Sequence, residues 1–239
     1  MKSNSQEIMP LNEFLLWATV ITLSALSYYL NQAFVQILLF WSVIIIVHGF
    51  IKRINSDKHY MVALIIRRSF YVIPLFIPLL MYRDFTFKSN VWLWCLLSLL
   101  IGFLFLLPKL KEWKLALHND FIIMMVTRSK SHYLLMIFVL VGSAVGEEFF
   151  FRHFILTSLH EFNPVFVVLL SGCLFVLYHF GTKWGGNFKK YDIIVQFLFG
   201  IISGILFVCS GSVLPCIIAH LVYNSPHVIM NYKSLKFAK

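Results

Sequence analysis

The chain of 239 residues is 60% hydrophobic and only 13% charged, and its mean hydropathy is +0.83. A soluble domain is usually about half apolar and about a quarter charged, so this composition excludes an ordinary soluble enzyme. The 17% of aromatic residues and the low charge exclude a disordered chain. We therefore expect a membrane protein.

Eight apolar runs approach the length of about 20 residues that a hydrocarbon core of about 30 Å requires. In the third run, Arg67 and Arg68 interrupt the start, and Pro74 and Pro78 are expected to kink or locally unwind the helix. Between the fourth and fifth runs, the mixed charged and apolar residues 109–126 predict an amphipathic helix lying on the membrane. The sequence thus predicts an all-α, polytopic membrane protein of about eight transmembrane helices, with a catalytic bundle formed by the C-terminal four. The runs are 14–30, 34–51, 62–82, 91–107, 133–160, 165–180, 193–208 and 213–230.

The formal net charge of +10 comes from an excess of basic residues, and membrane topology explains where these residues lie. With both termini in the cytoplasm, only Arg83 and Lys88 fall outside, Arg152 lies within the fifth run, and all other Lys and Arg residues fall on the cytoplasmic side. Attraction to anionic lipid then explains the charge, and no nucleic-acid partner is required. We expect an integral membrane protein, and the Lys, Ile and Phe bias favours a bacterial cell membrane.

Two adjacent carboxylates interrupt the fifth run, and they need a physical reason. A carboxylate at the centre of a transmembrane helix costs about 2.5 to 3.5 kcal/mol, so such residues are functional candidates. Glu148 and Arg152 stand four residues apart on one helical face and can neutralise each other. Glu147 points about 100° away and is left outside this pair. We therefore interpret Glu147 as functional, and Glu148 with Arg152 as supporting residues whose role is equally well structural.

Two histidines lie within later runs. His179 ends the sixth run, and His220 lies in the eighth with Asn224 one turn further on. Counting at about 1.5 Å per residue from the predicted turns places Glu147 and His179 at one level, with His220 and Asn224 within a turn or two. The four side chains are therefore expected to converge.

The other histidines lie at the ends of runs or in predicted loops. For these, His48 and His153 among them, we expect solvated or interfacial side chains.

A carboxylate, two imidazoles and a carboxamide can hydrolyse an amide with an activated water. Glu147 would take the proton from water, and His179 would orient the water and share the role of base. His220 and Asn224 could donate hydrogen bonds to the oxyanion as it forms.

The sequences EEFFFR at 147–152, FVLYH at 175–179 and HLVYN at 220–224 resemble, in order, the EExxxR, FxxxH and HxxxN signatures of the CPBP intramembrane endopeptidases. That family includes CAAX prenyl proteases and bacteriocin-processing or self-immunity proteins. The resemblance implies a glutamate protease in which Glu147 and His179 activate water and His220 and Asn224 form an oxyanion site. His153 departs from the pattern, because many relatives have Gly there. The resemblance covers roughly a third of the chain, about residues 143–224, and divides the chain into N-terminal helices at 1–130 and a catalytic core at 131–239.

The substrate that the resemblance implies is a membrane-associated or lipid-modified peptide or protein. The sequence leaves open whether this is a CAAX-type tail or a precursor of a peptide pheromone or bacteriocin.

Four other interpretations remain open. No cofactor is expected, but Glu147, His179 and His220 could serve as the two-His, one-carboxylate ligands of a catalytic zinc, although no HExxH motif is present. A serine mechanism could use Ser143 or Ser210, although neither lies in a GxSxG motif. The protein could also bind a bacteriocin for immunity without catalysis, or use buried Glu and His to relay protons or ions across the membrane.

Overall fold

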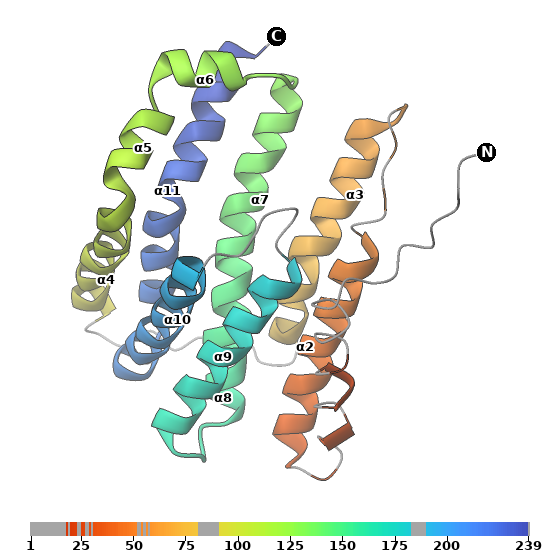
Figure 1. Cartoon of the computed structure of the whole chain (residues 1–239). Coiled ribbons are helices and arrows are strands. Elements are labelled where there is room, and N and C mark those ends of the chain that lie inside the picture. Colours follow the sequence, from red (N-terminus) through yellow and green to blue (C-terminus); the bar gives the residue numbers. More distant parts are fainter. Residues whose placement is uncertain are drawn as a thin grey trace.

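In a computed structural model of the chain, every regular element among the described residues is helical, as the composition predicted (Figure 1). The structure describes residues 18, 20–22, 25–26, 29, 31–51, 54, 56, 58–80, 91–182 and 190–238. The predicted run 14–30 falls mostly outside these residues, and Arg83 and Lys88 fall entirely outside them.

Five helices in the described part of the chain are long and apolar enough to cross a membrane, which identifies an integral membrane protein. The sixth predicted run appears as a shorter apolar helix, and the eighth as the first part of a long helix that becomes more polar. The five candidate spans are Gln32–Ile51, Tyr60–Leu80, Val91–Ala116, Lys130–Ser158 and Tyr191–Ser210.

The predicted disturbance of the third run by its prolines is confirmed. Helix α2 (Gln32–Ile51) is followed by α3 (Tyr60–Val72), which tightens into the 3-10 helix η1 (Ile73–Leu80) containing Pro74 and Pro78. In a 3-10 pattern residue 74 would donate to the carbonyl of Tyr71, but proline has no N–H. The imidazole of His48 on α2 lies 3.1 Å from this carbonyl through Nε2 and donates to it instead.

The predicted single amphipathic helix at 109–126 is wrong in form. Helix α4 (Val91–Leu106) passes through the short 3-10 helix η2 (Leu107–Lys109) into α5 (Leu110–Ala116), and α5 continues the course of α4 (Figure 1). The extended backbone of His118 then turns the chain, and only α6 (Asn119–Met125) crosses the end of the bundle. Asn119 and Asp120 start α6 at this break, because short polar side chains favour a helix start over a helix interior.

The fifth run forms one continuous rod, as predicted. It comprises α7 (Lys130–Glu148), the π-helical segment η3 (Phe149–Phe154) and α8 (Ile155–Ser158). Segments of π-helix are uncommon and are frequent at functional sites. Here the segment begins directly after the two carboxylates, so the helical phase changes at the candidate site.

The last three helices complete the bundle around this rod. They are α9 (Pro164–Thr182), α10 (Lys190–Ser210) and α11 (Leu214–Phe237). Helices α9 and α10 approach closely, because a Cβ atom on Gly200 would lie only 3.2 Å from the Cα of Gly172. Small residues at such crossings are typical of helix packing in membranes.

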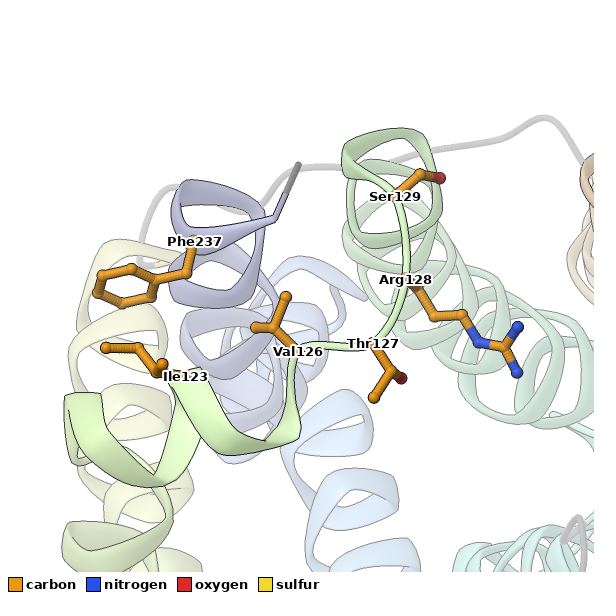
Figure 2. Close-up of a pocket in the computed structure, with 6 residues that line it drawn as sticks. All are labelled: Ile123, Val126, Thr127, Arg128, Ser129 and Phe237. Carbon is orange, nitrogen blue, oxygen red and sulfur yellow. The ribbon is translucent and has the colours of Figure 1, made fainter.

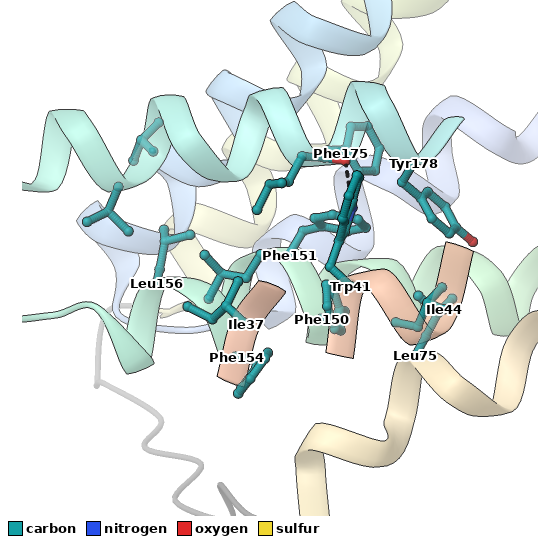
Figure 3. Packing of buried hydrophobic residues seen from close by; sticks show 14 of the residues in the cluster. Ile37, Trp41, Ile44, Leu75, Phe150, Phe151, Phe154, Leu156, Phe175 and Tyr178 are labelled. Atoms are coloured by element: carbon teal, nitrogen blue, oxygen red, sulfur yellow. Dashed lines mark hydrogen bonds between the residues drawn. The ribbon is translucent and has the colours of Figure 1, made fainter. Parts of the chain in front are cut away.

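Aromatic side chains fill the core beside the candidate site (Figure 3). The indole Nε1 of Trp41 on α2 donates to the carbonyl of Leu174 on α9 over 3.2 Å, which satisfies a polar group within this core. Phe175 belongs to this cluster and also faces His220, with ring centroids 6.2 Å apart, so the core shapes one wall of the site. The fully buried aromatic residues are Trp41, Phe150, Phe151, Phe154, Phe175, Tyr178 and Phe199.

Candidate active site

Three of the four predicted catalytic side chains meet around one oxygen atom. Oε2 of Glu147, in the last turn of α7, lies 3.6 Å from Nε2 of His179 in the last turn of α9. The same oxygen lies 3.8 Å from Nε2 of His220 on α11. The predicted common level of these residues is therefore confirmed.

The meeting point is buried but remains accessible on one side. The side chains of Glu147 and His220 are 4% and 5% exposed, whereas that of His179 is 18% exposed. Because His179 lies three residues before the end of α9, the more exposed side of the site is at this helix end.

Each imidazole is held by its other nitrogen. Nδ1 of His179 lies 2.8 Å from the carbonyl of Phe175, one turn earlier on α9, and Nδ1 of His220 lies 2.7 Å from Oε1 of Glu148. A carbonyl and a carboxylate can only accept, so both Nδ1 atoms carry the hydrogen. In the neutral rings, both Nε2 atoms are then acceptors that face the oxygen of Glu147.

When both rings are neutral, three acceptors surround one point and require a donor between them. Within the described part of the chain, Oε2 of Glu147 is buried and accepts no hydrogen bond, and its distances to the two Nε2 atoms exceed hydrogen-bonding range. Polar contacts longer than about 3.5 Å are often bridged by water. The arrangement is therefore suited to holding a water molecule whose two hydrogens point to these acceptors.

Glu148 pairs with Arg152 as the sequence predicted, but it does more than the sequence indicated. Nε of Arg152 lies 3.1 Å from Oε2 of Glu148, and both side chains are fully buried. The hydroxyl of Ser203 on α10 donates to the same Oε2 over 2.7 Å, while Oε1 accepts from His220. Glu148 thus connects α7, α10 and α11.

Arg152 is also held by aromatic rings. The carbon at the centre of its guanidinium group lies 4.4 Å from the ring centroid of Phe175 and 6.0 Å from that of Phe151. Such cation–π contacts stabilise a guanidinium that has been removed from water.

Asn224, the fourth predicted catalytic residue, takes no part in the contacts around Oε2 of Glu147. It is half-buried, one turn after His220 on α11, and its side chain forms no hydrogen bond with any residue that the structure describes. Its position on the face of His220 follows from the four-residue spacing.

The expectation for His48 and His153 is wrong, because both side chains are buried. His48 is fully buried and stacks on the ring of Tyr71, with centroids 4.6 Å apart. His153 lies inside the π-helical segment, against Phe149 and Phe207. His48 meets the interrupted end of α3 through the carbonyl of Tyr71, and His153 lies in the segment that follows Glu148.

No group of three or more His, Cys, Asp and Glu side chains within the described ranges could hold a metal ion as arranged. The three side chains that the sequence offered as zinc ligands, Glu147, His179 and His220, lie at the distances given above.

A separate pocket of about 580 Å³ lies at the end of the bundle near α6 (Figure 2). About 17 residues of α7 separate this pocket from Glu147, which is roughly 26 Å along a helix. It is therefore not part of the candidate active site. Its lining residues are Ile123, Val126, Thr127, Arg128, Ser129 and Phe237.

The C-terminal part of the chain is similar to one known family. Residues 129–226 match the family model described as type II CAAX prenyl endopeptidase Rce1-like, which is consistent with the CPBP signatures. The match begins at the start of α7 and contains Glu147, Glu148, His179, His220 and Asn224. No curated protein and no solved structure matches the chain.

Proposed function

We propose that the protein is an intramembrane endopeptidase that uses a glutamate and a histidine to activate water, because residues 129–226 match the Rce1-like endopeptidase family model. The observation that carries this proposal is the position of Oε2 of Glu147, buried and facing the Nε2 atoms of His179 and His220. The substrate is a peptide bond in a membrane-associated or lipid-modified peptide or protein.

The first step is the activation of water. Glu147 and His179 each accept a hydrogen bond from one water molecule, which leaves a lone pair of the water oxygen for attack on the carbonyl carbon. Glu147 then takes the proton and later returns it to the amine that leaves.

The second step is stabilisation of the oxyanion. His220 can donate from Nε2 only when it is doubly protonated, because Nδ1 already donates to Glu148. The carboxylate of Glu148 stabilises this imidazolium, as the acid of a catalytic triad does for its histidine. The carboxamide of Asn224 lies one turn away, forms no hydrogen bond within the described part of the chain, and supplies a second donor.

The family description favours a prenylated CAAX-type tail as the substrate. A precursor of a peptide pheromone or bacteriocin is the alternative substrate within the same chemistry. The two are distinguished by the peptide ends that the enzyme produces in native membranes.

A zinc-dependent version of the protease is the nearest alternative mechanism. As arranged, Glu147, His179 and His220 do not form a metal site, but the two imidazoles and Glu147 face one another while both Nδ1 atoms are held by acceptors. Acceptors of this kind commonly orient the histidines of metal sites. We expect activity in purified proteoliposomes to survive prolonged treatment with a strong zinc chelator. Loss of activity that added zinc restores would establish the metal mechanism instead.

The experiment that tests the proposal compares wild type with Glu147→Gln. An internally quenched peptide ending in a farnesylated cysteine and three further residues serves as the probe in proteoliposomes, and mass spectrometry maps peptide ends in native membranes. Loss of a general base typically costs 10² to 10⁴ in rate, so we expect the cleavage products to disappear.

The matched control is Glu161→Gln, the same chemical change at an exposed position after α8. Glu148→Gln is unsuitable as a control, because Glu148 holds His220. Wild-type cleavage by Glu147→Gln would overturn the proposal. A toxin-resistance phenotype that survives Glu147→Gln but not deletion of the protein would instead establish bacteriocin binding without catalysis.

A further inference from the structure

Helix α10 contributes no residue to the three motifs, yet it reaches the site through Ser203. The hydroxyl of Ser203 is buried and donates to Oε2 of Glu148 over 2.7 Å. We propose that Ser203 is a positioning residue that fixes the orientation of the Glu148 carboxylate and, through it, the imidazole of His220. The expected effect on catalysis rests on the proposed function, whereas the effect on the orientation of Glu148 and His220 does not.

The hydrogen bond from Ser203 restricts the orientation of the Glu148 carboxylate, whereas the charge of Arg152 does not. Arg152 lies 3.1 Å from the same oxygen, but none of its three guanidinium nitrogens forms a hydrogen bond to any described residue. Its charge attracts the carboxylate from a range of orientations. The terminal torsion of glutamate has broad, roughly two-fold preferences, so attraction alone leaves the carboxylate free to turn.

His220 depends on that orientation. Oε1 of Glu148 accepts from Nδ1 of His220 over 2.7 Å, and rotation of the carboxylate would misalign this bond. The bond determines which nitrogen of the ring carries the hydrogen, and therefore what Nε2 presents to Glu147. Ser203 thus acts on the reacting atoms through two successive hydrogen bonds.

Helix α10 contacts the same histidine in a second way. Phe199 lies one turn before Ser203 on the same face of α10, and its ring packs on the imidazole of His220 with centroids 5.0 Å apart. The carbonyl of Ser203 also accepts from Sγ of Cys216, one turn before His220 on α11, over 3.2 Å. One face of α10 therefore fixes both the ring of His220 and its carboxylate partner.

Two other buried serines in the bundle behave differently. The hydroxyls of Ser98 and Ser143 donate to carbonyls three residues earlier in their own helices, which is the usual choice for serine within a helix. Ser203 instead directs its hydroxyl across to a carboxylate on another helix. This difference favours a role for the side chain beyond the packing of α10.

The test uses Ser203→Ala, with Ser171→Ala as the matched control. Ser171 is equally buried, and its hydroxyl also crosses to another segment, donating to the carbonyl of Phe151 over 2.6 Å, but it does not contact Glu148. Purified protein with ¹⁵N-labelled histidine would be studied by NMR, with the His220 signals assigned from their absence in His220→Gln. This readout does not depend on proteolysis.

We expect Ser203→Ala to shift the Nδ1 signal of His220, whereas Ser171→Ala leaves it unchanged. On the farnesylated peptide we expect kcat to fall about 10-fold with KM unchanged, since hydrogen bonds to charged groups are among the stronger ones. Unchanged His220 signals in Ser203→Ala would overturn the inference. Equal losses of kcat in both variants would assign Ser203 a structural role only. Failure of Glu147→Gln to abolish cleavage would remove the proposed function but leave the NMR result to decide the inference.

Discussion

Gly102 on α4 lies against the backbone of α11 directly beside the candidate site. A Cβ atom at this position would stand 2.6 Å from the carbonyl oxygen of Ala219 and 2.7 Å from Cβ of Val222. Ordinary contact begins near 3.4 Å, so Gly102→Ala requires the two helices to separate by about 0.8 Å. Because Ala219 precedes His220, a displacement of α11 moves the imidazole by a similar amount.

The expected effects of Gly102→Ala follow from this displacement. Overpacking of this kind costs about 1 to 3 kcal/mol of stability. A misplacement of about 1 Å in a catalytic group can cost 10²-fold in rate, so we expect kcat on the farnesylated peptide to fall about 10- to 100-fold. Thermal unfolding in detergent and steady-state kinetics in proteoliposomes measure the two effects.

Gly142→Ala is the matched control. A Cβ atom on Gly142 would meet only Cγ1 of Val72, at 3.2 Å, and a side-chain methyl group can yield where a backbone carbonyl cannot. We expect this variant to retain wild-type kcat. A Gly102→Ala protein with a lowered Tm but wild-type kcat would show that α4 yields instead of α11, and would refute the link to His220.

Two further predictions concern buried partners. Arg152→Leu leaves the carboxylate of Glu148 buried without its counter-charge, so we expect about 3 to 5 kcal/mol of destabilisation, measured by chemical denaturation in detergent. A loss below about 1 kcal/mol would show that the pair contributes little. Trp41→Phe removes the donor to the carbonyl of Leu174 and should lower stability by about 1 to 2 kcal/mol in the same assay, whereas Trp92→Phe at an exposed position should not.

The sequence predicted the level at which the candidate catalytic residues meet, because helix rise converts residue counts into depth. The three motifs lie on three helices. Counting residues along each helix was sufficient to predict that Glu147, His179 and His220 lie close together. Counting could not reveal that His220 lies between both carboxylates. That result depends on the rotation and separation of α7 and α11, which no local pattern encodes.

The contacts of Ser203 and His48 could not be predicted from the sequence. Ser203 occupies an apolar run in which serine is an ordinary residue of helix packing, and only the position of α10 gives its hydroxyl a carboxylate partner. The sequence does contain both features, the prolines of the third run and His48. Only the packing of α2 on α3 shows that the imidazole of His48 reaches the carbonyl of Tyr71 at the interruption.

The contacts of Glu148 also define an electrostatic balance for the buried site. Two carboxylates, Glu147 and Glu148, are offset by Arg152 and by the second proton on His220 in the form that donates to the oxyanion. When Glu147 takes a proton from water, its negative charge disappears as the oxyanion gains one nearby. In the proposed reaction the low-dielectric interior therefore never has to create a separated pair of charges, and it only relocates one charge within the reach of the same imidazole.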